Sequence, residues 1–466
     1  MPPGNESTYS WTSTSSRARL PGHQIPRGWR EPSPNRDDLC YNQKAGRLMA
    51  ALIEKAENLG INWLSLHASE AGRPIYEKIG FSTWAEMGIN VPTVLKRLPN
   101  PYTRYTPMNV RFFWEVGDDF TLAHRGNPYG PLLAIAMAKL GIQYQPGSYD
   151  FTRKWLDETR ESSDVLHINW LHHFYKADHL STSIRNLKRF TNNLTYAQSI
   201  GYRIVWTLHN LYPHERPFPE IDHDAQVTMC QVADEVVAHC QYAADRCAEL
   251  FYRTERLTVV PHGNYINAYP NDLSKADART ALGIPQDARV FVFSGNARPY
   301  KGIDRLVETF RKIAQPDEHL LLMMRHFRFN PQYALDYVEL AQGTPNITAV
   351  SSDFFEREDF QSYLCAGDVA VLPFVDVLTS GSSILALSFG LPVVLPRLGC
   401  LPEVVGDDEG FLFDPHDPAG LGQALQATRQ ADLTAMSDAA IRRARELDWD
   451  SIAQTIAPLY SPGEQP

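Results

Sequence analysis

Two cations follow an apolar segment in the second half of the chain, at a spacing that suits the binding of an anion. The sequence FVFSGNARPYKGIDRLVETF places Arg298 and Lys301 after an expected strand at residues 290–293 and before an expected helix at residues 302–314. An arginine fork and a lysine charge beside a helix N-terminus match the two charges of a diphosphate. Gly295 allows the chain to turn where the strand ends. The alternative is a pair of solvated surface cations.

A loop rich in serine and glycine follows a later expected strand and offers further donors to phosphate oxygens. It opens an apolar helix expected at residues 383–389, and its donors are Ser380, Gly381, Ser382 and Ser383. The first backbone N–H groups of a helix lack partners within the helix, so they can donate to an anion. An ordinary helix N-cap is the alternative. Because the two elements lie in successive units of one expected domain, they point to one shared anion site.

Strands and helices alternate along most of the chain, which predicts α/β domains with parallel sheets covered on both faces. The alternation begins near residue 109 and restarts near residue 289, after a polar stretch with Pro270 and Pro285. We therefore expect two Rossmann-like domains, at residues 101–275 and 276–466. Ligands bind at the carboxyl ends of the strands in such sheets, so two facing domains predict a central cleft.

The first hundred residues have a different character. Residues 1–36 are rich in Ser, Thr, Pro and Arg, and we expect a disordered tail there, with a transit peptide as the alternative. Residues 37–100 are expected to hold a small α/β fragment, with a strand at residues 61–68, and a linker punctuated by prolines.

Composition excludes several classes of protein. The net charge of −10 argues against nucleic-acid binding, and no apolar run approaches the length of a membrane-spanning helix. No apolar signal-peptide core stands near the start. The six cysteines are scattered without a CxxC pair, which favours reduced thiols, a cytoplasmic location and neither a disulfide framework nor a zinc site.

Polar residues at expected strand ends of the first domain are candidates for acceptor binding and for a general base. His209 follows the strand RIVWTL, where an imidazole can hydrogen-bond a hydroxyl or relay a proton near neutral pH; a structural histidine is the alternative. A Gly-Asn loop further upstream lets a ligand approach backbone N–H groups. The candidate bases are His209, Asp118, Asp119 and Glu215, and the loop candidates are Gly126, Asn127 and Tyr129.

Several motifs resemble GT-B glycosyltransferases of the broad group 1, family-4-like set, over residues 108–460. They are GNARPYKGID, DVAVLPF, SFGLPVV, LGCLPEVV, EGFLFDP and LDWDSIAQTIAPLY. The resemblance implies two Rossmann-like domains facing a cleft. It also implies transfer of a hexose from GDP-mannose or a UDP-hexose to a glycan or lipid-linked acceptor.

The resemblance also implies roles for single residues. Arg298 and Lys301 are expected to contact the donor diphosphate, His209 to face the donor hexose and Glu403 to contact the donor sugar. Trp449 is expected to anchor a last helix that crosses back onto the first domain.

One departure from the resembled family bears on the reaction. Retaining members usually carry two glutamates in the second phosphate element, and Val377 and Leu385 stand at those positions here. The serine- and glycine-rich loop resembles that of inverting β-mannosyltransferases, so inversion is favoured. No metal ion is expected, because Arg298 and Lys301 can neutralise the diphosphate and no DxD cluster follows a strand. A non-catalytic protein that binds sugar nucleotides is the alternative.

Two further features suggest partners. Residues 40–90, with LHAS and the run AGRPIYEKIGF, resemble the carboxyl-terminal part of a GNAT acetyltransferase; we expect an accessory module, with an acetyltransferase as the alternative. The expected helix near residues 183–202 carries Arg185, Lys188, Arg189 and Arg203 among apolar residues. This pattern suggests peripheral contact with an anionic membrane, and a solvated face is the alternative.

Overall fold

The computed structural model describes residues 108–114, 120–122, 126–326 and 330–461, together with the backbone of four short strands before residue 108. The chain divides into two units, Met1–Arg104 and Tyr105–Pro466. The described strands of the first unit form one sheet in the order β1-β2-β4-β3, with bounds β1 Ser10–Thr12, β2 Trp63–His67, β3 Ser82–Thr83 and β4 Met87–Asn90.

This small sheet bears on two expectations for the first hundred residues. The strand expected at residues 61–68 is confirmed as β2. β1 pairs in parallel with β2, so the expectation of a disordered tail at residues 1–36 is wrong for Ser10–Thr12. The rest of that tail and the helices expected at residues 37–100 lie outside the described residues.

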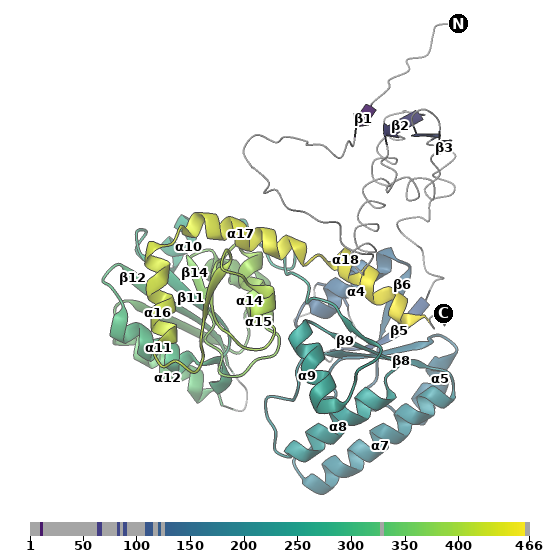
Figure 1. Cartoon of the computed structure of the whole chain (residues 1–466). Coiled ribbons are helices and arrows are strands. Elements are labelled where there is room, and N and C mark those ends of the chain that lie inside the picture. Colours follow the sequence, from purple (N-terminus) through teal and green to yellow (C-terminus); the bar gives the residue numbers. More distant parts are fainter. Residues whose placement is uncertain are drawn as a thin grey trace, which may run out of the picture. The chain divides into compact units, whose positions relative to one another are not determined.

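The first sheet of the second unit has six parallel strands in the order β10-β9-β8-β7-β5-β6 (Figure 1). Its strands are β5 Met108–Phe113, β6 Ile142–Pro146, β7 Val165–Ile168, β8 Arg203–Leu208, β9 Glu235–Ala238 and β10 Leu257–Val259. All four residues of β7 are buried, as expected for a strand covered on both faces. The helices between these strands are α4 Tyr129–Lys139, α5 Arg153–Arg160, α6 His172–Tyr175, α7 Leu180–Ser199, α8 Pro219–Val232 and α9 Gln241–Phe251.

The second sheet repeats this architecture, with six parallel strands in the order β13-β12-β11-β14-β15-β16. Its strands are β11 Arg289–Asn296, β12 Glu318–Arg325, β13 Ile347–Ser352, β14 Val369–Val371, β15 Val393–Pro396 and β16 Gly410–Phe413. The helices around it are α10 Lys275–Leu282, α11 Ile303–Ile313, α12 Gln332–Gln342, α13 Arg357–Leu364, α14 Gly381–Ser388, α15 Leu401–Val404, α16 Gly420–Ala427 and α17 Leu433–Glu446.

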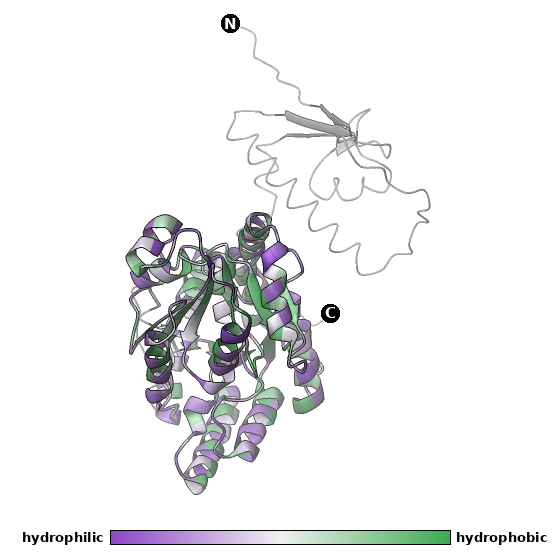
Figure 2. Ribbon diagram, turned by 90° about the vertical axis from the view of Figure 1, so that its left-hand side faces the viewer, coloured by the Kyte–Doolittle hydropathy of each residue, from purple (hydrophilic) through white to green (hydrophobic). Residues whose placement is uncertain are grey.

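The pattern of apolar residues explains these elements. In β11 the four residues from Val290 to Phe293 are at most 1% exposed, as a central parallel strand requires. In α11 the buried residues recur at helical spacing, as Ile303, Leu306, Val307 and Phe310. Figure 2 shows the same division across the unit, with green apolar strands inside and purple polar residues on many outer helix faces.

The end of the chain returns to the first sheet, as the sequence predicts. Helix α18 (Trp449–Ile456) packs beside α4 (Figure 1), and the short helix η3 (Ala457–Tyr460) that follows it contacts β8. The Trp449 indole donates to the Asn264 carbonyl at 2.6 Å, and Lys139 pairs with Asp450 at 2.7 Å. The Tyr460 hydroxyl lies 2.6 Å from Nδ1 of His167. The role expected for Trp449 as an anchor is confirmed by these contacts.

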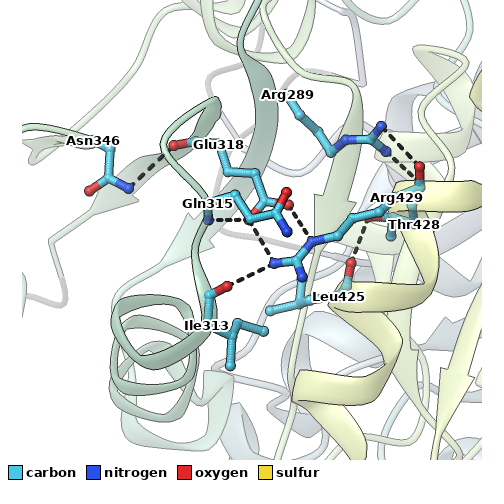
Figure 3. A network of polar contacts seen from close by, with 8 residues as sticks. All are labelled: Arg289, Ile313, Gln315, Glu318, Asn346, Leu425, Thr428 and Arg429. Atoms are coloured by element: carbon cyan, nitrogen blue, oxygen red, sulfur yellow. Dashed lines mark hydrogen bonds and ion pairs between the residues drawn. The ribbon is translucent and has the colours of Figure 1, made fainter.

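An ion pair between the buried Glu318 and the partly buried Arg429 joins α16 and its following turn to the amino end of the second sheet (Figure 3). Glu318 is 3% exposed, and its two carboxylate oxygens accept from Arg429 Nε at 2.8 Å and Nη2 at 3.0 Å. The Gln315 backbone N–H also donates to Glu318, and Arg289 donates to the Thr428 carbonyl. This network lies at the opposite end of β11 from Gly295.

The cysteines depart from the sequence expectation. Cys240, just before α9, and Cys400, just before α15, form a disulfide that links the two halves of the second unit. The expectation of reduced thiols without a disulfide is therefore wrong for this pair. Their separation of 160 residues gave no spacing signal, because the fold alone brings the two helix starts together.

Candidate functional site

The carboxyl ends of strands from both sheets border a cavity of about 410 Å³, which we call the sugar cavity. The first sheet contributes Asn169 and His209, which follow β7 and β8. The second sheet contributes Arg298 and Lys301, which follow β11. The cleft expected between facing domains is present, and it joins residues far apart in the sequence.

A second cavity of about 520 Å³, the nucleotide cavity, adjoins the first. Its walls include the Gly-Asn loop on one side and Gly295, Ser382 and Leu385 on the other. Aromatic and charged side chains from the ends of β12 and β13 complete it, among them Arg325 and Phe354. The residues that line both cavities are Asn127, Asn296, Lys301 and Gly381.

Arg298 reaches across the cleft. Its Nη1 donates to Glu215 Oε1 at 3.0 Å, and Lys176 donates to the Glu215 backbone carbonyl at 3.0 Å. Glu215 and Arg298 both line the sugar cavity. A bound diphosphate would therefore compete with the Glu215 carboxylate for the guanidinium. The predicted base Glu215 already serves as an ion-pair partner.

Lys301 lies where the two cavities meet, half-buried between aromatic rings. Its Nζ is 4.6 Å from the centre of the Phe374 ring and 5.4 Å from that of Tyr300. Burial, with a smaller contribution from the Arg298 charge, lowers the pKa of Lys301 to about 7. A lysine in this state gains its full charge when an anion binds beside it.

The lowered pKa of Lys301 predicts that the affinity for the donor depends on pH. A nucleotide sugar carries a constant charge near neutrality, so the proton taken up on binding goes to Lys301. We expect the affinity to fall about tenfold per pH unit above pH 7, because each complex must then acquire a proton from a scarcer supply. Isothermal titration between pH 6 and 8.5 measures this, and Lys301→Arg is expected to flatten the dependence. A flat wild-type profile would contradict it.

Gly302 fixes where Lys301 points. It ends the short helix η1 (Pro299–Lys301), starts α11 and has φ of 68°, which favours glycine. A Cβ atom there would lie 2.2 Å from the Pro373 carbonyl oxygen. No L-residue fits without moving the backbone on one side.

Replacing this glycine tests the close approach. We expect Gly302→Ala to lower the melting temperature and weaken binding of a nucleotide sugar, because the backbone that holds Lys301 must shift. Gly283→Ala is the matched control, since Gly283 has φ of 66° and nothing within 4 Å of the new Cβ. The control variant should lose only the stability that an L-residue costs in the left-handed backbone region, about 1–2 kcal/mol. Equal losses of stability and binding in the two variants would contradict the importance of the close approach between Gly302 and Pro373.

The serine- and glycine-rich loop is partly used by the protein itself. The Ser380 hydroxyl accepts from the Ser383 backbone N–H at 3.1 Å, and the Ser383 hydroxyl donates to the Ser380 carbonyl at 2.8 Å. Ser383 is 1% exposed and lines neither cavity. Its expected role as a phosphate donor is therefore wrong, because it closes the N-cap. Ser380 lines the sugar cavity, Ser382 the nucleotide cavity and Gly381 both.

Glu403 has a structural partner instead of the expected sugar contact. Its carboxylate accepts the backbone N–H groups of Gln241 at 2.8 Å and Tyr242 at 2.7 Å, in the first turn of α9. It lines neither cavity. A carboxylate is favourable at a helix N-terminus, so Glu403 joins the two halves of the unit beside the disulfide.

Of the remaining candidate residues of the first domain, some line the nucleotide cavity and one is buried in the core. Gly126 and Asn127 line the nucleotide cavity, and Asn127 Oδ1 accepts the Tyr129 N–H at 3.0 Å. Tyr129 is 1% exposed and packs edge-on against the His209 ring, so its expected place in the ligand loop is wrong. Asp118 and Asp119 lie outside the described residues.

His209 is held on both sides of its ring. Its Nε2 lies 2.8 Å from Asn169 Oδ1, its Nδ1 lies 3.2 Å from His239 Nε2, and Trp170 stacks on it at 4.6 Å. Burial, with contributions from neighbouring histidines, lowers the pKa of His209 well below its ordinary value. The ring is therefore neutral at pH 7, as a base must be.

Several histidines of the sugar cavity escaped the sequence reasoning. His172, His173 and His214 line it. His214 stacks on Tyr300 with ring centres 4.0 Å apart, and burial lowers the pKa of His214 to about 4. The run HINWLHH directly after a buried strand was the available signal for the first two.

Comparison with known proteins shows which proteins this chain is similar to. Residues 288–430 match the family described as glycosyl transferases group 1. Three similar curated proteins are named D-inositol 3-phosphate glycosyltransferase. That of Xylanimonas cellulosilytica is 29% identical over 54% of this chain and 62% of its own length. That of Corynebacterium efficiens is 25% identical over 71% and 78%, and that of Streptomyces avermitilis 24% over 86% and 87%.

Solved structures share the whole architecture of the second unit. Sucrose-phosphate synthase from Thermosynechococcus elongatus has a TM-score of 0.59 at 18% identity, covering 76% of this chain and 98% of that one. The Anabaena protein HepE in complex with UDP-glucose has a TM-score of 0.58 at 18% identity, covering 75% and 98%. The acetyltransferase-like fragment gains no support. The chain has the GT-B fold, and its residues 288–430 are similar to the group 1 glycosyl transferases.

Proposed function

We propose that this protein transfers a hexose from a nucleoside diphosphate sugar to a hydroxyl of a glycan or lipid-linked acceptor. The observation that carries the proposal is the meeting of Arg298, Lys301 and the start of α14 at the junction of the two cavities. Two cations and a helix N-terminus stabilise a diphosphate both when it is bound and when it leaves.

The donor is expected to span the two cavities. Its base and ribose fit the nucleotide cavity, where Arg325 lies 5.5 Å from the Phe354 ring, and its hexose fits the sugar cavity. GDP-mannose and UDP-hexoses remain the proposed donors. The Anabaena neighbour solved with UDP-glucose supports testing the latter first.

The acceptor is expected to enter the sugar cavity from the first domain. Trp170 offers a ring on which a sugar can stack, and Asn210 offers hydrogen bonds to hydroxyls. Val377 lines the sugar cavity and Leu385 the nucleotide cavity, at the positions where the resembled retaining enzymes carry glutamates. The absence of both carboxylates supports an inverting displacement with a separate base.

A thermal-shift screen against UDP, GDP, ADP and their sugars tests the binding step. One nucleoside diphosphate at 100 times its Kd should add about 2.7 kcal/mol of stability. Release of free hexose from the matching nucleotide sugar then tests catalysis and excludes the non-catalytic alternative. We expect EDTA to leave that rate unchanged, because protein cations carry the diphosphate charge. Flat responses to all ligands would contradict the proposal.

Contact with an anionic membrane is part of the same proposal. Leu180 and Ile184 on α7 are 46% and 48% exposed, beside Arg185 and Lys188. No helix among the described residues is long and apolar enough to span a membrane. We expect the protein to float with vesicles containing phosphatidylglycerol, and a double charge reversal at Arg185 and Lys188 to abolish this. Equal flotation of both proteins would contradict membrane contact.

A further inference from the structure

Both nitrogens of the His209 ring already have partners within the protein. Nε2 lies 2.8 Å from Asn169 Oδ1, and Nδ1 lies 3.2 Å from His239 Nε2. A general base takes a proton through a lone pair that a bound hydroxyl can reach. The side chains around His209 cover both in-plane positions of its ring, so an acceptor hydroxyl reaches neither nitrogen. His209 therefore belongs to the wall of the cavity, and the proposed transfer needs another base.

His172 lines the sugar cavity with a ring that has no hydrogen-bond partner among the described residues. Its side chain is partly buried, but neither ring nitrogen is buried. The centre of its ring lies 4.3 Å from that of His173 and 6.1 Å from that of Trp170. The ring nitrogen without a proton can therefore accept a hydrogen bond from a hydroxyl in the cavity.

The fold anchors the short helix that carries His172. Helix α6 begins at His172, four residues after the end of β7. Two further residues of α6, Phe174 and Tyr175, are only 4% and 2% exposed. The Tyr175 hydroxyl also donates to Asp222 Oδ1 on α8 at 2.7 Å. These contacts hold the backbone of His172 at the cavity, although its ring makes no hydrogen bond that would fix it.

The charges around His172 favour its neutral form in the free protein. Burial is the main cause that lowers its pKa to about 3, with contributions from His173, Lys176, His214 and Arg298. The ring is therefore neutral at pH 7 and keeps a lone pair. A donor diphosphate adds negative charge beside Arg298, which raises the pKa of His172 in the complex. The ring is thus a stronger base with the donor bound than without it.

His172 and the two cations of the site border the sugar cavity from different sheets. Helix α6 follows β7 of the first sheet, whereas Arg298 and Lys301 follow β11 of the second. In an inverting displacement the acceptor attacks the hexose from the side opposite the leaving diphosphate, so the base belongs on the side of the first sheet. We propose that His172 is the general base that takes the proton of the acceptor hydroxyl. This inference rests on the proposed transfer, and His172 is none of the four bases that the sequence suggests.

One proton and two bonds change in the proposed step. The acceptor oxygen bonds to the anomeric carbon of the hexose while the bond from that carbon to the diphosphate breaks. The electron pair of the broken bond stays on the diphosphate oxygen, beside Arg298 and Lys301. The hydroxyl proton passes to the unprotonated ring nitrogen of His172, which becomes an imidazolium. Because neither nitrogen of this ring is buried, the imidazolium then releases the proton to solvent.

Hexose release to water tests the base without a known acceptor. The donor is UDP-glucose or GDP-mannose, whichever stabilises the full wild-type chain in the thermal-shift screen. We expect His172→Ala to lower kcat about 10²- to 10⁴-fold, the usual contribution of a general base, while the Kd for the nucleoside diphosphate stays unchanged. His172→Gln, which keeps a polar side chain of similar size, should lose as much. His179→Ala is the matched control, since His179 is an exposed histidine before α7 that lines neither cavity.

Added imidazole distinguishes a base from a residue that only supports the fold. His172→Ala leaves room for a free imidazole, which can take the proton in place of the lost ring. We expect imidazole to raise the kcat of His172→Ala at least about tenfold and to leave that of the wild-type protein and of His179→Ala unchanged. Among substituted imidazoles of similar size, the restored rate should increase with the pKa of the added base. A residue that only supports the fold predicts no such dependence.

The outcomes separate the two proposals. A wild-type kcat in His172→Ala would overturn the role of His172. So would a loss of kcat that imidazoles do not restore in a variant that still binds the nucleoside diphosphate. In both cases hexose release by the wild-type protein would still support the proposed function. A wild-type protein that binds no nucleoside diphosphate, or that releases no hexose, would contradict the proposed function itself.

Discussion

Alanine at both Arg298 and Lys301 is expected to weaken binding of the donor at least about 10²-fold, because each cation contributes a charge-assisted hydrogen bond of about 1.5–3 kcal/mol. The loss should exceed the sum of the two contacts for a further reason. Glu215, which now pairs with Arg298 at 3.0 Å and with Lys176 at 3.9 Å, would keep only the longer ion pair and would repel the diphosphate more strongly. Isothermal titration with the nucleotide sugar that stabilises the wild-type protein measures the effect, and the rate of hexose release should fall with it.

The chain offers a matched control for this variant. Arg311 and Lys312 are the same residue types on α11, exposed and outside both cavities. Alanine at both removes the same net charge from the protein but leaves the site intact. We expect wild-type affinity from this control. Equal weakening in both double variants would show that long-range charge, and not contact at the site, holds the donor.

Arg429→Met is expected to destabilise the second domain by about 3 kcal/mol, the lower end of the cost of breaking a buried ion pair. Glu318, 3% exposed, would lose the guanidinium and retain the Gln315 N–H as a donor to its carboxylate (Figure 3). Urea unfolding, followed by a probe in the second domain, measures the loss. Donor binding should be unchanged in the folded protein, because the network lies at the far end of β11 from the cleft.

Removing both partners separates the ion pair from simple packing. In Glu318→Gln combined with Arg429→Met, no buried charge is left without a partner, so much of the lost stability should return. The coupling from the double-mutant cycle is expected to be at least about 1 kcal/mol. Additive losses in the two single variants would contradict the ion-pair account.

Local sequence patterns predicted the elements that carry the proposed diphosphate site. The buried run at Val290–Phe293, the turn after it and the helical spacing of Ile303 to Phe310 all lie within 21 consecutive residues. Hydrophobic periodicity records such local information directly. For the same reason Arg298 and Lys301 lie at the cleft, where a strand end and a helix start place them.

Contacts between distant segments could not be predicted in this way. The motif around Glu403 indicated a sugar contact, but its carboxylate caps α9, which starts about 160 residues earlier in the chain. The same pair of helix starts brings Cys240 to Cys400. His209 and His239 lie 3.2 Å apart because the neighbouring strands β8 and β9 end side by side, and the sequence shows each strand end only by itself.

The central claim is that the diphosphate of a sugar nucleotide lies at the junction of the two cavities. A crystal structure of the protein with the stabilising nucleoside diphosphate tests it most directly. We expect phosphate oxygens within hydrogen-bonding distance of the Arg298 guanidinium and the Lys301 ammonium, with Glu215 displaced from Arg298. A diphosphate bound elsewhere, with the Arg298–Glu215 ion pair intact, would contradict the account.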